Sequence, residues 1–71
     1  MNLTTQELAT FCDGMAVQGN HYMAAVACVA LGTSYEWWHL PLSPEQMKSV
    51  RSLDSEAATT IVDDYVWEMT G

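Results

Sequence analysis

Positive charge is almost absent from this sequence of 71 residues, in which 2 Lys and Arg side chains stand against 9 Asp and Glu. The formal net charge is -7 at pH 7. Nucleic acids and anionic membranes are bound by clusters of Lys and Arg, so neither is expected as a direct partner. Disorder is not expected either, because 49% of the residues are hydrophobic. This length favours a single domain.

Cysteine and histidine are also scarce. Cys12 and Cys28 are too few for a disulfide scaffold, and His21 and His39 occur singly, with no CxxC or HxxxH spacing. We therefore expect no metal and no cofactor. Both cysteines lie in hydrophobic stretches where burial makes a thiol unreactive, so enzyme activity is not expected.

Long hydrophobic runs are missing as well. The longest run, residues 22–31, is roughly half of a membrane span. The N-terminal sequence MNLTTQEL has neither the basic start nor the apolar stretch of a secretory signal. We expect a cytoplasmic protein with reduced thiols and no membrane partner.

Capping signals divide the chain into helices. Thr4 and Glu7 have the spacing of a capping box before a first helix, and Gly19 is its expected stop. Asn20 can cap a second helix over residues 21–31, which is hydrophobic on every face and rich in alanine. Such a helix must be covered by other elements or lie at a subunit interface, so we place it at the centre of the fold.

The rest of the chain carries three further helical signals. Thr33 and Glu36 repeat the capping-box spacing before a short helical turn that Pro41 ends. Residues 43–46 combine a Ser cap, a proline and a glutamine, which is the strongest helix start in the sequence. A 3.6-residue hydrophobic period predicts a last helix over residues 55–69. The prediction is an all-α fold, a small single-domain bundle of four helices plus one short helical turn.

The last helix separates a hydrophobic face from an acidic one, at about 100° per residue. The hydrophobic face contains Ala58, Ile61, Val62, Tyr65 and Met69. The opposite face, which we call the acidic stripe, consists of Glu56, Thr60, Asp63, Asp64, Trp67 and Glu68. Trp67 is expected to project toward water from among these carboxylates.

Two interpretations of the acidic stripe are open. Tryptophan often anchors interfaces, because its flat amphipathic ring fills a pocket at little entropic cost. The stripe would then dock onto a basic groove of a partner protein. Alternatively, the carboxylates form an ordinary solvated surface and Trp67 covers a neighbouring loop.

A second aromatic cluster contains Tyr35, Trp37, Trp38 and His39. Adjacent Trp side chains cannot both face one direction on a helix, so we expect one in the core and the other partly exposed. A platform for a base or a sugar has little support without nearby cations, and core packing is favoured.

The two cysteines lie at similar distances from the expected hinge at Gly19 and Asn20. If the first two helices fold back there, Cys12 and Cys28 touch across the hairpin, as a core contact or as a redox-dependent disulfide. We favour the contact, because a cytoplasmic setting keeps thiols reduced.

Asp54 and Ser55, followed by Asp63 and Asp64, are superficially similar to the Asp-Ser-Leu start of the acidic helix in acyl carrier proteins. That resemblance implies a phosphopantetheine arm on the serine. Glu56 stands where the family has leucine, and only residues 56–71 follow Ser55, which leaves no space for the family's later helix. We interpret the match as accidental.

The leading functional hypothesis is a small non-enzymatic module that binds a basic protein surface. Proteins of this size and acidity resemble in kind, though not in any motif, phage-encoded inhibitors that occlude nucleic-acid-binding surfaces of host or defence proteins. The competing hypothesis is a structural subunit whose hydrophobic second helix completes a homodimer or another homo-oligomer.

Overall fold

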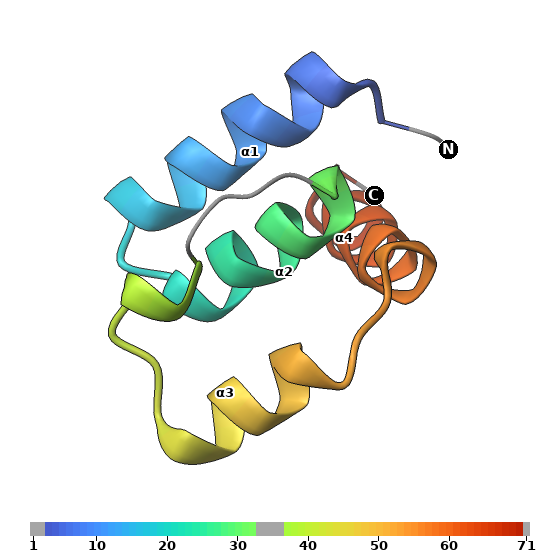
Figure 1. Ribbon diagram of the computed structural model, residues 1–71. Coiled ribbons are helices and arrows are strands. Elements are labelled where there is room, and N and C mark those ends of the chain that lie inside the picture. The colour runs from blue at the N-terminus through green and yellow to red at the C-terminus, as the bar shows by residue number, and fades with distance from the viewer. Residues whose placement is uncertain (1–2, 33–36, 71) are drawn as a thin grey trace.

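The computed structural model describes residues 3–32 and 37–70 of the chain. The elements in chain order are α1 (Thr5–Val17), α2 (His21–Leu31), the 3-10 helix η1 (Trp37–His39), α3 (Pro44–Arg51) and α4 (Ser55–Thr70), as Figure 1 shows. These two ranges contain no strand, so the all-α fold predicted from the sequence is confirmed. The capping box predicted at Thr33 and Glu36 lies outside the described residues.

Two capping boxes begin α1 and α3 where the sequence places them. The Thr4 hydroxyl accepts a hydrogen bond from the Glu7 backbone N–H at 3.1 Å, and the Glu7 carboxylate accepts one from the Thr4 N–H at 3.0 Å. Ser43 and Gln46 form the same reciprocal pair at 3.2 and 3.0 Å. Each box satisfies two backbone donors that a helix start leaves unpaired, which fixes the starting residue.

Side-chain caps also begin the other two helices. The Asn20 carboxamide oxygen accepts from the Met23 N–H at 3.2 Å, and an Asp54 carboxylate oxygen accepts from the Ala57 N–H at 2.7 Å. Gly19 links α1 to α2 with φ of +86°, a left-handed conformation that glycine adopts without steric cost. The turn is therefore short, and α1 folds back along α2.

Helix α2 lies at the centre of the fold. Residues 23–28 and Ala30 are buried, and α1 and α4 pack against α2, with α3 and η1 also in contact (Figure 1). Four of these buried residues are alanines, whose small side chains allow neighbouring helices to approach closely. The hydrophobic surface of α2 is thus covered largely within one chain.

The surrounding helices each contribute to this core. Leu8 and Met15 of α1, Val50 of α3, and Ala58 and Val62 of α4 are buried against α2. Together they bring all four helices around one hydrophobic cluster, in which Val26, Val50 and Val62 are the largest fully buried side chains. None of the helices in the described ranges has both the length and the hydrophobicity needed to cross a bilayer.

Of the two adjacent tryptophans, one packs against the core and the other is partly exposed, as expected. The end of α4, however, does not follow the predicted pattern of burial. Trp37 packs against the core, and Trp38 is 49% exposed. Met69, assigned to the hydrophobic face of the last helix, is 63% exposed. Burial declines along the final turns of α4, from the buried Val62 through the half-buried Val66, so the period continues after the core has ended.

Candidate functional site

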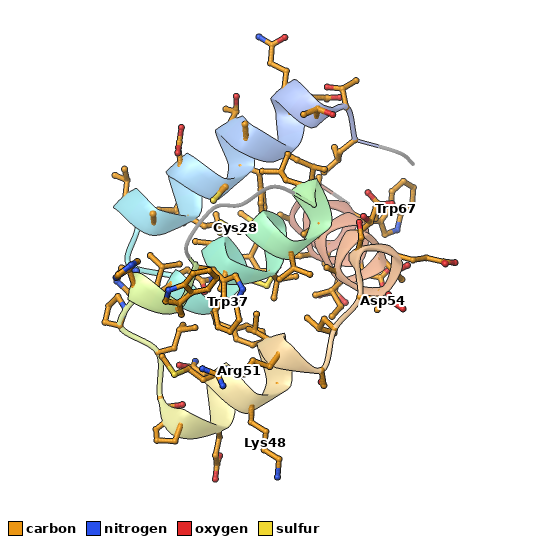
Figure 2. The ribbon with its side chains drawn as sticks, in the orientation of Figure 1. Cys28, Trp37, Lys48, Arg51, Asp54 and Trp67 are labelled. Atoms are coloured by element: carbon orange, nitrogen blue, oxygen red, sulfur yellow. The ribbon has the colours of Figure 1, made fainter. Side chains whose placement is uncertain are left out.

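The acidic stripe lies on the side of α4 turned away from the core. Ala58 and Val62 face inward, whereas every stripe residue except Asp63 is exposed. Trp67 is 67% exposed, and Figure 2 shows its ring directed away from the helices. The orientation of Trp67 inferred from the helical period is therefore the one that the structure has.

Hydrogen bonds within α4 determine which polar groups of the stripe remain available for intermolecular hydrogen bonds. The Thr60 hydroxyl donates to the Glu56 backbone carbonyl at 3.1 Å, and the Thr59 hydroxyl donates to the Ser55 carbonyl at 2.8 Å. These hydroxyl protons are used inside the helix. Carboxylate oxygens are then the main polar groups of the stripe, and they suit the N–H donors of Lys and Arg.

Asp63 differs from the other stripe carboxylates because it is half-buried. Its Oδ1 atom is buried and has no hydrogen-bond partner among the described residues. A buried acceptor without a donor costs stability.

A groove that sequence reasoning did not foresee lies beside the stripe, with a volume of about 460 Å³. Its walls are Leu3, Thr4, Gln6, Glu7, Thr10, Phe11 and Val66. Val66 immediately precedes Trp67, so the α4 wall of the groove adjoins the stripe. Leu3 and Val66 lie near opposite ends of the sequence, and they line one groove because α1 and α4 both pack against α2.

A second hollow lies within the stripe itself, near the start of α4. It has a volume of about 370 Å³ and is lined by Asp54, Glu56, Ala57, Thr60 and Ile61. Two stripe residues therefore form part of a concave surface with both acidic and hydrophobic walls.

Charge is segregated over the molecule. The only two cations, Lys48 and Arg51, lie on α3, and Figure 2 shows both well away from Trp67. The acids of α1 are Glu7 and Asp13, and α4 carries four more in the stripe. The hydrogen bonds from the Thr4 backbone and hydroxyl lower the pKa of Glu7, so its carboxylate is ionised at neutral pH. The α1 and α4 surfaces are negative without any compensating cation of their own.

The sequence also offers a metal site, a nucleophilic cysteine and a carrier serine as candidate chemistry, and each can be compared with the structure. No three His, Cys, Asp or Glu side chains in the described ranges are grouped to hold a metal ion. Burial and a hydrogen bond with Cys12 raise the pKa of Cys28 to about 12, which disfavours the nucleophilic thiolate. The Ser55 hydroxyl, the expected attachment point in the acyl-carrier resemblance, donates to the Ala30 carbonyl at 3.2 Å and ties α4 to α2.

Comparisons of the chain with protein-family models, with curated proteins and with solved structures find no match.

Proposed function

We propose that this chain is a small acidic, non-enzymatic module that docks through the acidic stripe onto a basic surface of a partner protein. The observation that supports the proposal most directly is Trp67, a large ring exposed at 67% among carboxylates. A single exposed hydrophobic residue is ordinary, but Trp67 lies beside a groove and within a surface of one charge sign.

In the proposed complex, Trp67 enters a pocket of the partner, and the carboxylates pair with Lys and Arg around that pocket. Desolvation of the indole supplies most of the affinity, because buried aromatic anchors dominate interface energetics. The charges accelerate association and reject acidic partners. The groove beside Val66 receives a hydrophobic side chain that lies next to a cation in the partner, with Glu7 at its rim.

The biological role that fits this mechanism is inhibition. A basic surface that binds nucleic acid in a host or defence protein would be occluded if carboxylates took the place of phosphates. The module would act in the cytoplasm, without contacting nucleic acid or membrane itself. In this role the protein would act as a phage-type inhibitor.

The matched pair Trp67→Ala and Trp38→Ala tests the proposal, since both rings are exposed but lie on different surfaces. A partner is first captured from lysate of the source cell by the wild-type chain and then purified. Calorimetry should show Kd raised at least about 30-fold by Trp67→Ala, in line with an anchor residue, and changed by less than about 3-fold by Trp38→Ala.

Thermal unfolding of both variants is the control. The Tm of Trp67→Ala should stay close to that of wild type, because the exposed ring contributes little to the core. Equal affinity of the two Trp variants, or a captured partner whose contact surface is acidic, would overturn the proposal. A stable dimer in light scattering at micromolar concentration would instead support the competing hypothesis, a structural subunit whose second helix completes a homo-oligomer.

A further inference from the structure

Cys12 of α1 and Cys28 of α2 face one another inside the helical hairpin. Their sulfur atoms are 3.3 Å apart, and the Cys12 thiol also lies 3.4 Å from the Ala24 carbonyl oxygen. Cys12 is half-buried and Cys28 is buried, and Figure 2 shows Cys28 between the two helices. Both are free thiols, so the contact predicted across the hairpin is confirmed.

The two thiols differ in their surroundings. The Cys12 thiol can donate to the Ala24 carbonyl, and either thiol can donate in the contact between the two sulfurs. Burial is the largest cause of the raised pKa of Cys28, followed by this hydrogen bond and by the charges of Cys12 and Asp13. Cys28 therefore keeps its proton, while Cys12 is the sulfur closer to solvent.

We propose that Cys12 and Cys28 form a reversible disulfide site that closes when the protein meets a peroxide. The Cys12 thiol first gives its proton to water. Its sulfur then attacks one oxygen of hydrogen peroxide, the O–O bond breaks, a sulfenic acid forms, and the released hydroxide takes up a proton from the solvent to become water. The Cys28 sulfur then attacks the Cys12 sulfur. The S–O bond breaks, the S–S bond forms, and a second water leaves with the Cys28 proton.

Electrons and atoms balance in this sequence, since two thiols and one peroxide give one disulfide and two waters. The sulfurs are already in contact, so closure needs only a small shift of the side chains on two helices that the Gly19 turn holds together. Closing the loop between residues 12 and 28 restricts the unfolded chain. The oxidised protein should therefore unfold about 12–24 °C above the reduced protein.

The test uses the full chain, reduced first and then treated with hydrogen peroxide at pH 7.5. Free thiols are blocked with N-ethylmaleimide, and the protein is cleaved after Lys48, which leaves both cysteines in one peptide. After peroxide, the wild-type peptide should carry no maleimide adduct, and its mass should be about 2 Da below that of the unlabelled reduced peptide. The protein should remain monomeric, and its Tm should rise. A dithiol reductant should restore both adducts and the original Tm.

Two single variants identify the order of the steps. With Cys28→Ala, dimedone should trap a sulfenic acid on Cys12, because no second thiol resolves it. With Cys12→Ala, Cys28 should stay reduced and gain a maleimide only after unfolding. The proposal is wrong if wild type keeps both reactive thiols after peroxide, if it forms only intermolecular dimers, or if Cys12 accumulates sulfinic acid instead of the disulfide.

Discussion

Burial changes the chemistry of individual side chains in this small core, and Cys28 is the clearest case. Cys28 is buried, and burial removes the water that would solvate its thiolate. Its pKa is raised to about 12 from an ordinary 9.0. The protonation state of one sulfur is therefore linked to whether the chain is folded.

This linkage predicts a loss of stability at alkaline pH. The folded state holds the Cys28 proton up to about pH 12, whereas the unfolded chain releases it above about pH 9. The stabilisation is fully present below pH 9 and declines as the pH rises toward 12. The free energy of unfolding measured with urea in the presence of a reductant should fall between pH 8.5 and 10.5.

Cys28→Ala is the control for this pH dependence. The other ionisable side chains are the same in both proteins, so the difference between wild type and variant isolates Cys28. Wild type should lose more stability than Cys28→Ala over the same pH interval. If the free energy of unfolding falls equally with pH in the two proteins, the protonation of Cys28 is not linked to folding.

Among the elements, α2 and α4 depend on small residues where they meet. Ala58 of α4 is fully buried, whereas the adjacent Ala57 is half-buried and lines the hollow within the stripe. An added leucine side chain at a packed contact forces the helices apart, at a cost of about 1–3 kcal/mol. Ala58→Leu should therefore lower Tm by roughly 4–20 °C.

Ala57→Leu is the matched control, because the substitution and the helix are the same and only the surroundings differ. Its leucine has open space in the hollow, so Tm should change by no more than about 2 °C. Thermal unfolding of the two variants side by side checks the prediction. Similar losses in both would mean that helix propensity, and not packing, decides the outcome.

Capping explains why the helices could be located from the sequence. A box such as Thr4 with Glu7 is a contact between residues three apart, so its partners are visible in the sequence itself. The contact between Cys12 and Cys28 could also be predicted from the sequence, because both residues lie about two helical turns from the same hinge. Local spacing carries this information without knowledge of the tertiary fold.

Features that depend on how the helices pack against one another could not be predicted from the sequence. The exposure of Met69 reflects the end of the core along α4, which the hydrophobic period does not encode. The groove between Leu3, Phe11 and Val66 depends on where α1 and α4 each pack against α2. The outward orientation of Trp67, in contrast, follows from the helical period alone, since the stripe belongs to one helix.

Over the whole molecule, negative charge is concentrated in the acidic stripe, where it has opposing effects on the stability of α4. Asp64 and Glu68 are one turn apart on α4 and repel one another, and Glu68 lies in the last turn, where the helix dipole disfavours an anion. Glu56, in the first turn, is favoured by the same dipole. The acidic stripe thus contains carboxylates that help the helix and carboxylates that weaken it.

Neutralising the two ends of the stripe should therefore have opposite effects on stability. The double variant Asp64→Asn with Glu68→Gln should raise Tm by about 2–5 °C in 20 mM salt, and the gain should shrink in 0.5 M salt, where the charges are screened. Glu56→Gln should lower Tm by about 1–3 °C. Scanning calorimetry at the two salt concentrations measures all three proteins.

Binding to the captured partner then distinguishes the two interpretations of the stripe. If the carboxylates contact a basic surface, the double variant should be more stable than wild type and yet bind at least about 5-fold more weakly, with a smaller dependence of Kd on salt. The presence of carboxylates that weaken α4 would then be explained by their contribution to binding the partner. If stability changes as expected while affinity stays the same, the stripe is a solvated surface, and the docking site must be sought elsewhere on the molecule.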